Sequence, residues 1–240
     1  MEILAIIPAR GGSKGIKNKN IRLFAGRPLL SYAVDHAKQS KYINRVIVST
    51  ESAHIARVAK KSGAEVPFLR PAEFAQDKSR VVDAIVHLLN TLKTESGYEP
   101  DVIVLLQATS PLRTVEDVDR TIKLFTDAGA DSAVTVCATE QLVFTKDTGH
   151  RLKKVTTQKE LSRSANRQEL PRTYKFDGSM VYVIKTKVFL KHKSFLAGKL
   201  VAYEIPRWRA VDLDEPQDFV VGELLFNNFV TLKNRIKKFK

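Results

Sequence analysis

A glycine-rich segment with four cationic residues comes directly after the first apolar run of the chain. The segment, residues 8–20, has the sequence PARGGSKGIKNKN. Glycines let the backbone approach an anion closely, and Arg10, Lys14 and Lys19 supply positive charge. The spacing matches neither the G-x-x-x-x-G-K-S/T loop of NTPases nor the G-x-G-x-x-G dinucleotide pattern. A glycine turn with solvated lysines is the alternative, but cations crowded at one strand end favour a polyphosphate site.

A glutamine follows another apolar run, in the segment QATSPLR of residues 107–113. The Gln107 amide has both hydrogen-bond donors and acceptors to offer a substrate. Alternatively, the segment is only the start of the next helix, with Pro111 near its first turn. Composition alone leaves both interpretations of Gln107 open.

Two acidic residues, Asp212 and Asp214, are separated by a single leucine near the end of the chain. If residues 211–214 are extended, both carboxylates point to the same face. Beside a phosphate site, the cation that suits such a pair is Mg²⁺, which prefers one or two carboxylates together with phosphate oxygens. The alternative is that both acids balance the basic surface or begin a helix at Glu215, where anions suit the helix dipole. Because a phosphate site is predicted, we favour the metal.

The elements that position these residues follow from the apolar pattern. Short apolar runs without alternation are typical of strands covered on both faces, and segments with helical spacing lie between them. This order predicts an α/β fold with a doubly wound, mostly parallel sheet, in which ligands bind beyond the carboxyl ends of the strands. The predicted strands are residues 3–7, 45–50, 102–106, 132–136, 179–184 and 200–205, and the predicted helices are 29–39, 54–62, 81–94, 115–128 and 215–232.

Local signals mark several boundaries. Gly63 and Gly129 follow predicted helices, and Ser79 or Thr114 can cap the helix that each precedes. Polar residues without a clear period dominate from about 140 to 171. This stretch predicts a lid or arm inserted into a single domain that comprises residues 1–240.

The net charge of +14 predicts anionic partners: nucleic acid, a membrane surface, or small phosphorylated or carboxylated substrates. A nucleic-acid-binding protein is disfavoured, because the cations are scattered and no RNA-binding motif is present. The single cysteine excludes an intrachain disulfide and a cysteine-based zinc site. With no secretory signal and no run of the ~20 apolar residues that a membrane span needs, we expect a cytoplasmic protein without a membrane partner.

Four motifs in order along nearly the whole chain resemble those of the acylneuraminate cytidylyltransferases, the CMP-sialic acid synthetases. They are IPARGGSKG at residues 7–15 with Lys19-Asn20, LQATSPLR at 106–113, RQELP at 167–171 and VDLD at 211–214. The resemblance implies a Rossmann-like nucleotidyltransferase fold and transfer of CMP from CTP to a nine-carbon α-keto sugar acid, with release of pyrophosphate. It also implies a homodimer, formed through the arm at residues 140–171.

The resemblance also implies roles for individual residues. Those implied for catalysis are Arg10, Lys14, Lys19 and Asp212, and those implied as Mg²⁺ ligands are Asp212 and Asp214. The residues implied to bind the nucleotide are Ala9, Arg10, Gly11, Gly12, Ser13, Lys14, Lys19, Arg70, Asp77 and Ser79. The residues implied to bind the sugar are Gln107, Arg167, Gln168, Tyr174, Lys175 and Asp177.

One position departs from the family pattern. Where the family usually has Asn-Gly after an aromatic residue, this chain has Asp177-Gly178. The change replaces an amide that can donate with an acceptor-only carboxylate, beside the expected place of an anionic sugar. Legionaminic acid and related nonulosonic acids are therefore as credible as N-acetylneuraminic acid. The eight-carbon sugar Kdo is a weaker alternative, because its cytidylyltransferases are not expected to have the GGSKG sequence.

Overall fold

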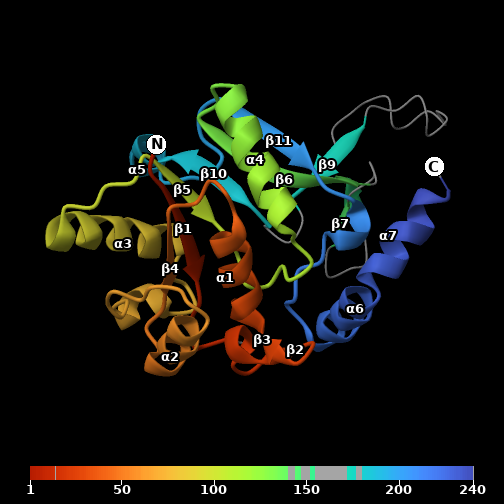
Figure 1. Ribbon diagram of the computed structural model, residues 1–240, viewed down its shortest axis with the longest axis horizontal. Helices are drawn as coiled ribbons and strands as arrows, with labels where there is room; N and C mark the ends of the chain where they lie inside the picture. Colours follow the sequence, from red (N-terminus) through yellow and green to blue (C-terminus); the bar gives the residue numbers. More distant parts are fainter. Residues whose placement is uncertain (14, 140–143, 147–151, 155–171, 177–179, 240) are drawn as a thin grey trace.

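The computed structural model describes residues 1–13, 15–139, 144–146, 152–154, 172–176 and 180–239. A mixed sheet lies at its centre, with the strand order β11-β6-β10-β5-β1-β4 and with β9 paired to β6 (Figure 1). These strands are β1 (Ile3–Pro8), β4 (Arg45–Ser49), β5 (Val102–Leu105), β6 (Ser132–Thr139), β9 (Thr173–Lys175), β10 (Tyr182–Lys185) and β11 (Leu200–Glu204).

The sheet is mostly parallel, as the apolar runs predict. Strand β1 is parallel to both β4 and β5, and β11 is parallel to β6. Strand β10 is antiparallel to its neighbours β5 and β6, and β9 is antiparallel to β6. The chain passes from β1 to β4 on one side and then returns to β5 on the other side of β1. The gap beyond β1 and β5 is therefore the switch point at which ligands bind in such folds.

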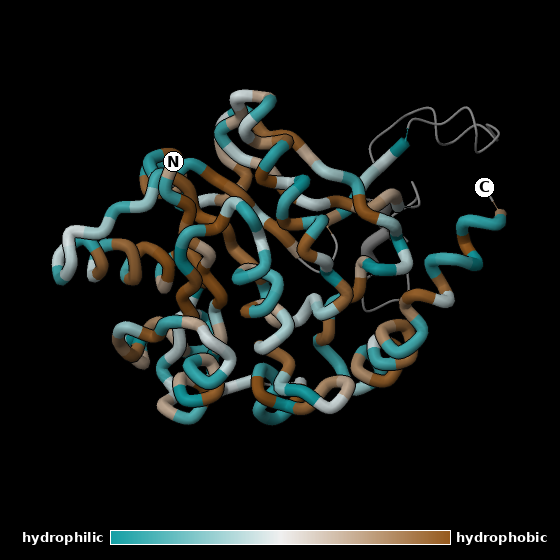
Figure 2. Tube along the Cα trace, in the orientation of Figure 1, coloured by the Kyte–Doolittle hydropathy of each residue, from teal (hydrophilic) through white to brown (hydrophobic). Residues whose placement is uncertain are grey.

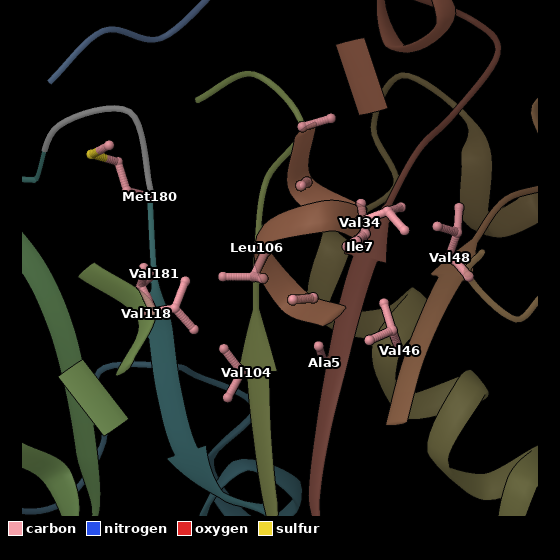
Figure 3. Packing of buried hydrophobic residues seen from close by; sticks show 14 of the residues in the cluster. Ala5, Ile7, Val34, Val46, Val48, Val104, Leu106, Val118, Met180 and Val181 are labelled. Atoms are coloured by element: carbon pink, nitrogen blue, oxygen red, sulfur yellow. The ribbon is translucent and has the colours of Figure 1, made fainter. Parts of the chain in front are cut away.

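Helices cover both faces of the sheet. Along β1, Ala5 and Ile7 pack in one buried cluster with residues of α1, α2 and α4 (Figure 3), while Leu4 and Ile6 pack in another with residues of α3 and α5. Figure 2 shows the central strands as mostly hydrophobic, which agrees with a sheet buried on both faces. The helices are α1 (Leu29–Gln39), α2 (Ala53–Lys61), α3 (Val81–Ser96), α4 (Val115–Asp127), α5 (Thr186–His192), α6 (Pro216–Asn227) and α7 (Phe229–Lys237).

Short elements complete the described chain. Two hairpin ladders, β2 (Leu23–Phe24) with β3 (Arg27–Pro28) and β7 (Phe144–Lys146) with β8 (Leu152–Lys154), stand apart from the main sheet. Short 3-10 helices are η1 (Lys19–Ile21), η2 (Ala72–Ala75) and η5 (Arg207–Arg209). Most of the predicted arm at 140–171 lies outside the described residues, so the arm stays a prediction. None of the helices in the described part of the chain is long and apolar enough to span a membrane.

Two local predictions need correction, one is confirmed, and one helix was not predicted. The last predicted helix is two helices, because the chain leaves helical geometry at Asn228. Ser79 does not cap α3, since its hydroxyl donates to the Glu73 carbonyl and accepts from the Gln76 amide within the preceding turn. Thr114 does cap α4, in a reciprocal capping box with Asp117. Helix α5 was not predicted, because its seven residues are too few for a clear period.

Candidate active site

A cleft of about 560 Å³ opens at the switch point beyond β1 and β5. Four segments that are distant in sequence line it: the glycine-rich segment, the stretch from Arg70 to Val81, the turn after β5, and the acidic turn before α6. The lining residues are Pro8, Arg10, Ser13, Gly15, Lys19, Asn20, Arg70, Phe74, Gln76, Asp77, Ser79, Val81, Gln107, Ala108, Thr109, Asp214 and Glu215.

The glycine-rich segment folds back over the end of β1. The buried Asn20 side chain donates a 2.9 Å hydrogen bond to the Arg10 carbonyl and so closes the loop. A side chain at Gly15 would place its Cβ 2.5 Å from the Asp214 carbonyl oxygen, which is closer than real Cβ contacts. Glycine at position 15 is therefore required by the close approach of the acidic turn.

Glu51, just after β4, supports the same segment. Its carboxylate accepts 2.6 Å and 2.8 Å hydrogen bonds from the Gly11 amide and from Arg70 Nη2. Burial alone would raise the pKa of Glu51, but these hydrogen bonds outweigh burial and lower the pKa below its ordinary value. Glu51 was not predicted as a site residue, although it lies just beyond a strand, as Gln107 does.

The contact with Glu51 involves one of the glycines that are predicted to bind the nucleotide. The Gly11 amide points to Glu51, so it is engaged by a carboxylate and not turned into the cleft. Among the described residues, Ala9, Gly11 and Gly12 do not line the cleft, and the Ala9 amide donates to the Ser49 carbonyl. Arg10, Ser13 and Lys19 line the cavity, and nucleotide binding by Ala9, Gly11 and Gly12 stays a prediction. Lys14 lies outside the described residues.

Among the described residues, two pairs of a cation with a carboxylate line the cleft, and the lining residue Arg70 pairs with Glu51, which is not a lining residue. Lys19 Nζ lies 2.7 Å from Asp214 Oδ1, Arg10 Nη1 lies 3.4 Å from Asp77 Oδ1, and Arg70 pairs with Glu51. The first two pairs are partly exposed and contribute little to stability. Arg10 and Lys19 can therefore leave their carboxylates and bind a polyanion with little loss of folding free energy.

One wall of the cleft combines a buried arginine with an aromatic ring. The Arg70 amide donates to the Thr50 carbonyl at 2.8 Å, which holds the wall against the end of β4. The Phe74 ring lies on η2, with its centroid 5.0 Å from that of His87. A flat apolar ring that lines a cleft is a surface on which a nucleobase can stack. Phe74 was not predicted, because nothing in its local sequence separates it from a core residue.

A buried ion pair joins Asp117 to Arg209, which lies just before the acidic turn in the chain. Arg209 donates to both carboxylate oxygens of Asp117, with Nη2 2.9 Å from Oδ1. The Val211 amide donates to the Arg209 carbonyl at 2.9 Å. The Leu213 amide donates to the Thr109 carbonyl at 3.0 Å, which joins the acidic turn to the turn after β5. Asp214 is thereby placed on the cleft, beside Lys19.

The predicted arrangement of the two acids is only half correct. Residues 211–214 belong to no strand, so alternation along a strand does not place both carboxylates on one face. Asp214 lines the cleft, whereas Asp212 is half-buried and is not among the described lining residues. Within the described ranges, no group of three or more His, Cys, Asp or Glu side chains is placed to hold a metal ion.

Comparison with known proteins decides the family. A family model described as "Cytidylyltransferase" matches residues 4–224, which is most of the chain. The chain belongs to the cytidylyltransferase family. The match includes every strand of the main sheet and all four segments that line the cleft.

Individual relatives agree with this assignment. The chain is 33% identical to a CMP-N,N'-diacetyllegionaminic acid synthase from Legionella pneumophila, over 94% of this chain and 96% of the relative. It is 28% identical to an N-acylneuraminate cytidylyltransferase from Streptococcus agalactiae, over 95% of this chain and 54% of the relative. A solved CMP:2-keto-3-deoxy-manno-octonic acid synthetase complexed with CTP has the same fold, with a TM-score of 0.70, 16% identity and coverage of 95% and 99%.

The structure describes Gln107, Tyr174 and Lys175 among the predicted sugar residues of this family member, and these three are not gathered in one place. Gln107 lines the cleft, and its carbonyl accepts a 3.1 Å hydrogen bond from Arg113. Tyr174 and Lys175 lie exposed on β9, at the end of β6, which β10 and β5 separate from β1 (Figure 1). Among the described residues, neither of them lines the cleft. Arg167, Gln168 and Asp177 lie outside the described residues.

Proposed function

We propose that this protein transfers CMP from CTP to a nonulosonic acid, a nine-carbon α-keto sugar acid, and releases pyrophosphate. The observation that carries the proposal is the cleft itself. Arg10 and Lys19 face one part of it, and Gln107 faces the part beyond β5. Membership of the cytidylyltransferase family and the names of the legionaminate and neuraminate relatives support the choice of substrates.

In the proposed reaction the triphosphate lies along the glycine-rich segment. Arg10, Lys14 and Lys19 neutralise the phosphate oxygens, and cytosine lies against the wall of Arg70 and Phe74. The anomeric hydroxyl of the sugar attacks the α-phosphorus in line, the bond to the β-phosphate oxygen breaks, and pyrophosphate leaves. Catalysis of this kind needs positioning and charge stabilisation and no covalent enzyme intermediate.

The acidic turn fits a divalent cation. Asp214 presents its carboxylate to the cleft beside Lys19, where phosphate oxygens are expected, and Asp212 lies two residues before it. Mg²⁺ prefers this donor set of one or two carboxylates with phosphate oxygens. When bound, the ion would supply further neutralisation of the phosphate charge. We propose Asp212 and Asp214 as its ligands.

We also propose that the protein acts as a cytoplasmic homodimer through the arm at residues 140–171. Tyr174 and Lys175 lie on β9, away from the described cleft of their own protomer. If they contact sugar, the sugar is then held by another copy of the chain. Sedimentation at several concentrations tests the dimer, and a single monomeric species at micromolar concentration would contradict it.

A substrate panel tests the proposed reaction. Purified protein with CTP and Mg²⁺ is given N-acetylneuraminate, legionaminate derivatives, other nine-carbon keto acids and Kdo, and pyrophosphate release is measured. We expect release with at least one nine-carbon acid. Release with Kdo alone would replace the proposal by the eight-carbon alternative, and no release with any acid would refute both.

A further inference from the structure

Arg113, the last residue of the QATSPLR segment, is a charged side chain in the interior of the protein. Only 2% of its surface is exposed, and it is among the largest fully buried side chains in the described chain. It does not line the cleft. Charged residues are almost never fully buried unless they are paired, so this position calls for an explanation.

The guanidinium joins the segment after β5, which lines the cleft, to the segment before β10. Nη1 of Arg113 donates to the Gln107 carbonyl at 3.1 Å and to the Met180 carbonyl at 2.6 Å. Gln107 follows β5, and Met180 precedes β10, which pairs antiparallel with β5 so that Tyr182 lies opposite Leu105. The two carbonyls are therefore neighbours beyond the same end of this strand pair, and one cation holds both.

The other nitrogens of the guanidinium lack hydrogen-bond partners that would offset their burial. Within the described part of the chain, Nε and Nη2 of Arg113 are buried and make no hydrogen bond. Burial lowers the pKa of Arg113 to about 9, against the opposing effect of the Asp117 carboxylate, so the side chain is still a cation at neutral pH. A buried charge with unmet hydrogen bonds reduces stability, and an apolar side chain of similar size is often tolerated as well or better. Stability alone does not account for arginine here.

We propose that Arg113 is a positioning residue for the sugar substrate, which fixes Gln107 relative to the chain that enters β10. Met180 comes three residues after Asp177, the position at which this chain departs from the family pattern. Arg113 thus couples the glutamine predicted to contact the sugar with the segment predicted to select it. The inference rests on the proposed function, because it assigns the sugar to the part of the cleft that Gln107 lines.

The test compares Arg113→Met, which removes the charge and nearly keeps the length, with Arg113→Lys, which keeps the charge but replaces the guanidinium by an ammonium on a shorter side chain. Leu112→Met is the matched control, since Leu112 is the adjacent buried residue and is not placed in the site. For each variant, KM for the best sugar and KM for CTP are measured separately, together with CTP affinity by calorimetry and the melting temperature.

We expect Arg113→Met to fold and to raise the KM for sugar by about tenfold, the loss of roughly one hydrogen bond to a charged group, with CTP affinity within about twofold of wild type. Arg113→Lys should recover part of the sugar affinity, and Leu112→Met should change neither constant. Equal changes in both KM values, or a lower melting temperature with unchanged sugar KM, would show that Arg113 only supports the fold.

A readout that needs no sugar separates this inference from the proposed reaction. Arg113→Met should speed amide hydrogen exchange around residues 107–110 and 180–183 while leaving the glycine-rich segment unchanged. If Arg113→Met does not fold, the same comparison is made with Arg113→Lys. Wild-type protein that turns over no nine-carbon acid refutes the function, whereas unchanged exchange in the variants refutes the positioning role.

Discussion

The two halves of the cleft are built differently. The half that we propose binds CTP consists of turns after the adjacent parallel strands β1 and β4, and Glu51 ties these turns together through Gly11 and Arg70. The half that we propose binds the sugar has Gln107 after β5, and its backbone is linked to the chain that enters β10, a strand antiparallel to β5. Arg113 joins these two segments.

We expect CTP binding and sugar selectivity to depend on different parts of the fold. The CTP half depends on the order of parallel strands and on contacts within one sheet edge. The sugar half depends on Gln107 and on its link through Arg113 to the chain before the antiparallel strand β10, and that chain can change without rebuilding the CTP half. Substitutions in one half are therefore expected to change the kinetics of one substrate more than those of the other.

The largest effect is expected at the acidic turn, which serves both halves. Asp212→Asn should lower kcat by at least about 10²-fold at saturating Mg²⁺, because a metal contributes several kcal/mol of charge stabilisation. The fold should stay intact by circular dichroism. Asp127→Asn is the control, since that exposed carboxylate pairs only with Lys123 in the described structure. Activity near that of the control would show that Asp212 serves only to balance charge.

The next largest effect is expected at a cation of the CTP half. Lys19→Met removes the ammonium that lies beside Asp214 on the cleft. Loss of one charge-assisted hydrogen bond, worth about 1.5–3 kcal/mol, should lower kcat/KM for CTP by roughly 10- to 100-fold. KM for sugar should change little, with Lys123→Met as the surface control. A larger change for sugar than for CTP would reverse the assignment of the two halves.

A smaller effect on CTP is expected at Glu51. Glu51→Gln keeps an acceptor for the Gly11 amide but removes the charge that faces Arg70, so KM for CTP should rise by a few-fold. Because hydrogen bonds hold the pKa of Glu51 below its ordinary value, its stabilising effect exists above the unfolded-state pKa and is lost as pH falls through the folded-state pKa.

The pH dependence provides the check on Glu51. Between neutral pH and about pH 3, the melting temperature of the wild type should fall more than that of Glu51→Gln, because the variant has no carboxyl to protonate at this position. Parallel curves for the two proteins would mean that Glu51 does not hold the two turns together in solution.

The smallest effect, on selectivity alone, is expected at Asp177. Asp177→Asn restores the amide that the related family usually has, and it should shift the ratio of kcat/KM between N-acetylneuraminate and legionaminate toward N-acetylneuraminate. A gained hydrogen bond of about 1 kcal/mol corresponds to a shift of several-fold. KM for CTP should not move. An unchanged ratio would place sugar selection elsewhere in the sugar half.

Much of the fold could be predicted from local signals. Residues 3–7 are apolar without alternation, and they form a strand buried on both faces. The helix predicted at 29–39 has those bounds in the structure. The two predicted helix caps had different outcomes. Thr114 caps its helix, whereas the Ser79 hydroxyl makes its hydrogen bonds inside the preceding turn. Local sequence shows that a cap is possible, and only the competing partners decide whether it forms.

The sequence by itself determined the sheet, the edge on which the glycine-rich segment and Gln107 meet, and the cations of the proposed phosphate site. Apolar periodicity and strand ends dictate these features, because burial of apolar surface acts on every residue of a run. The tertiary structure alone decided that Glu51 engages Gly11 and Arg70, that Asp214 and not Asp212 lines the cleft, and that Arg113 holds two carbonyls. Each of these features joins residues distant in the chain or depends on the path of an irregular turn. A hydrogen bond forms only when donor and acceptor lie about 3 Å apart with suitable angles, and the packing of the elements decides which groups meet this condition.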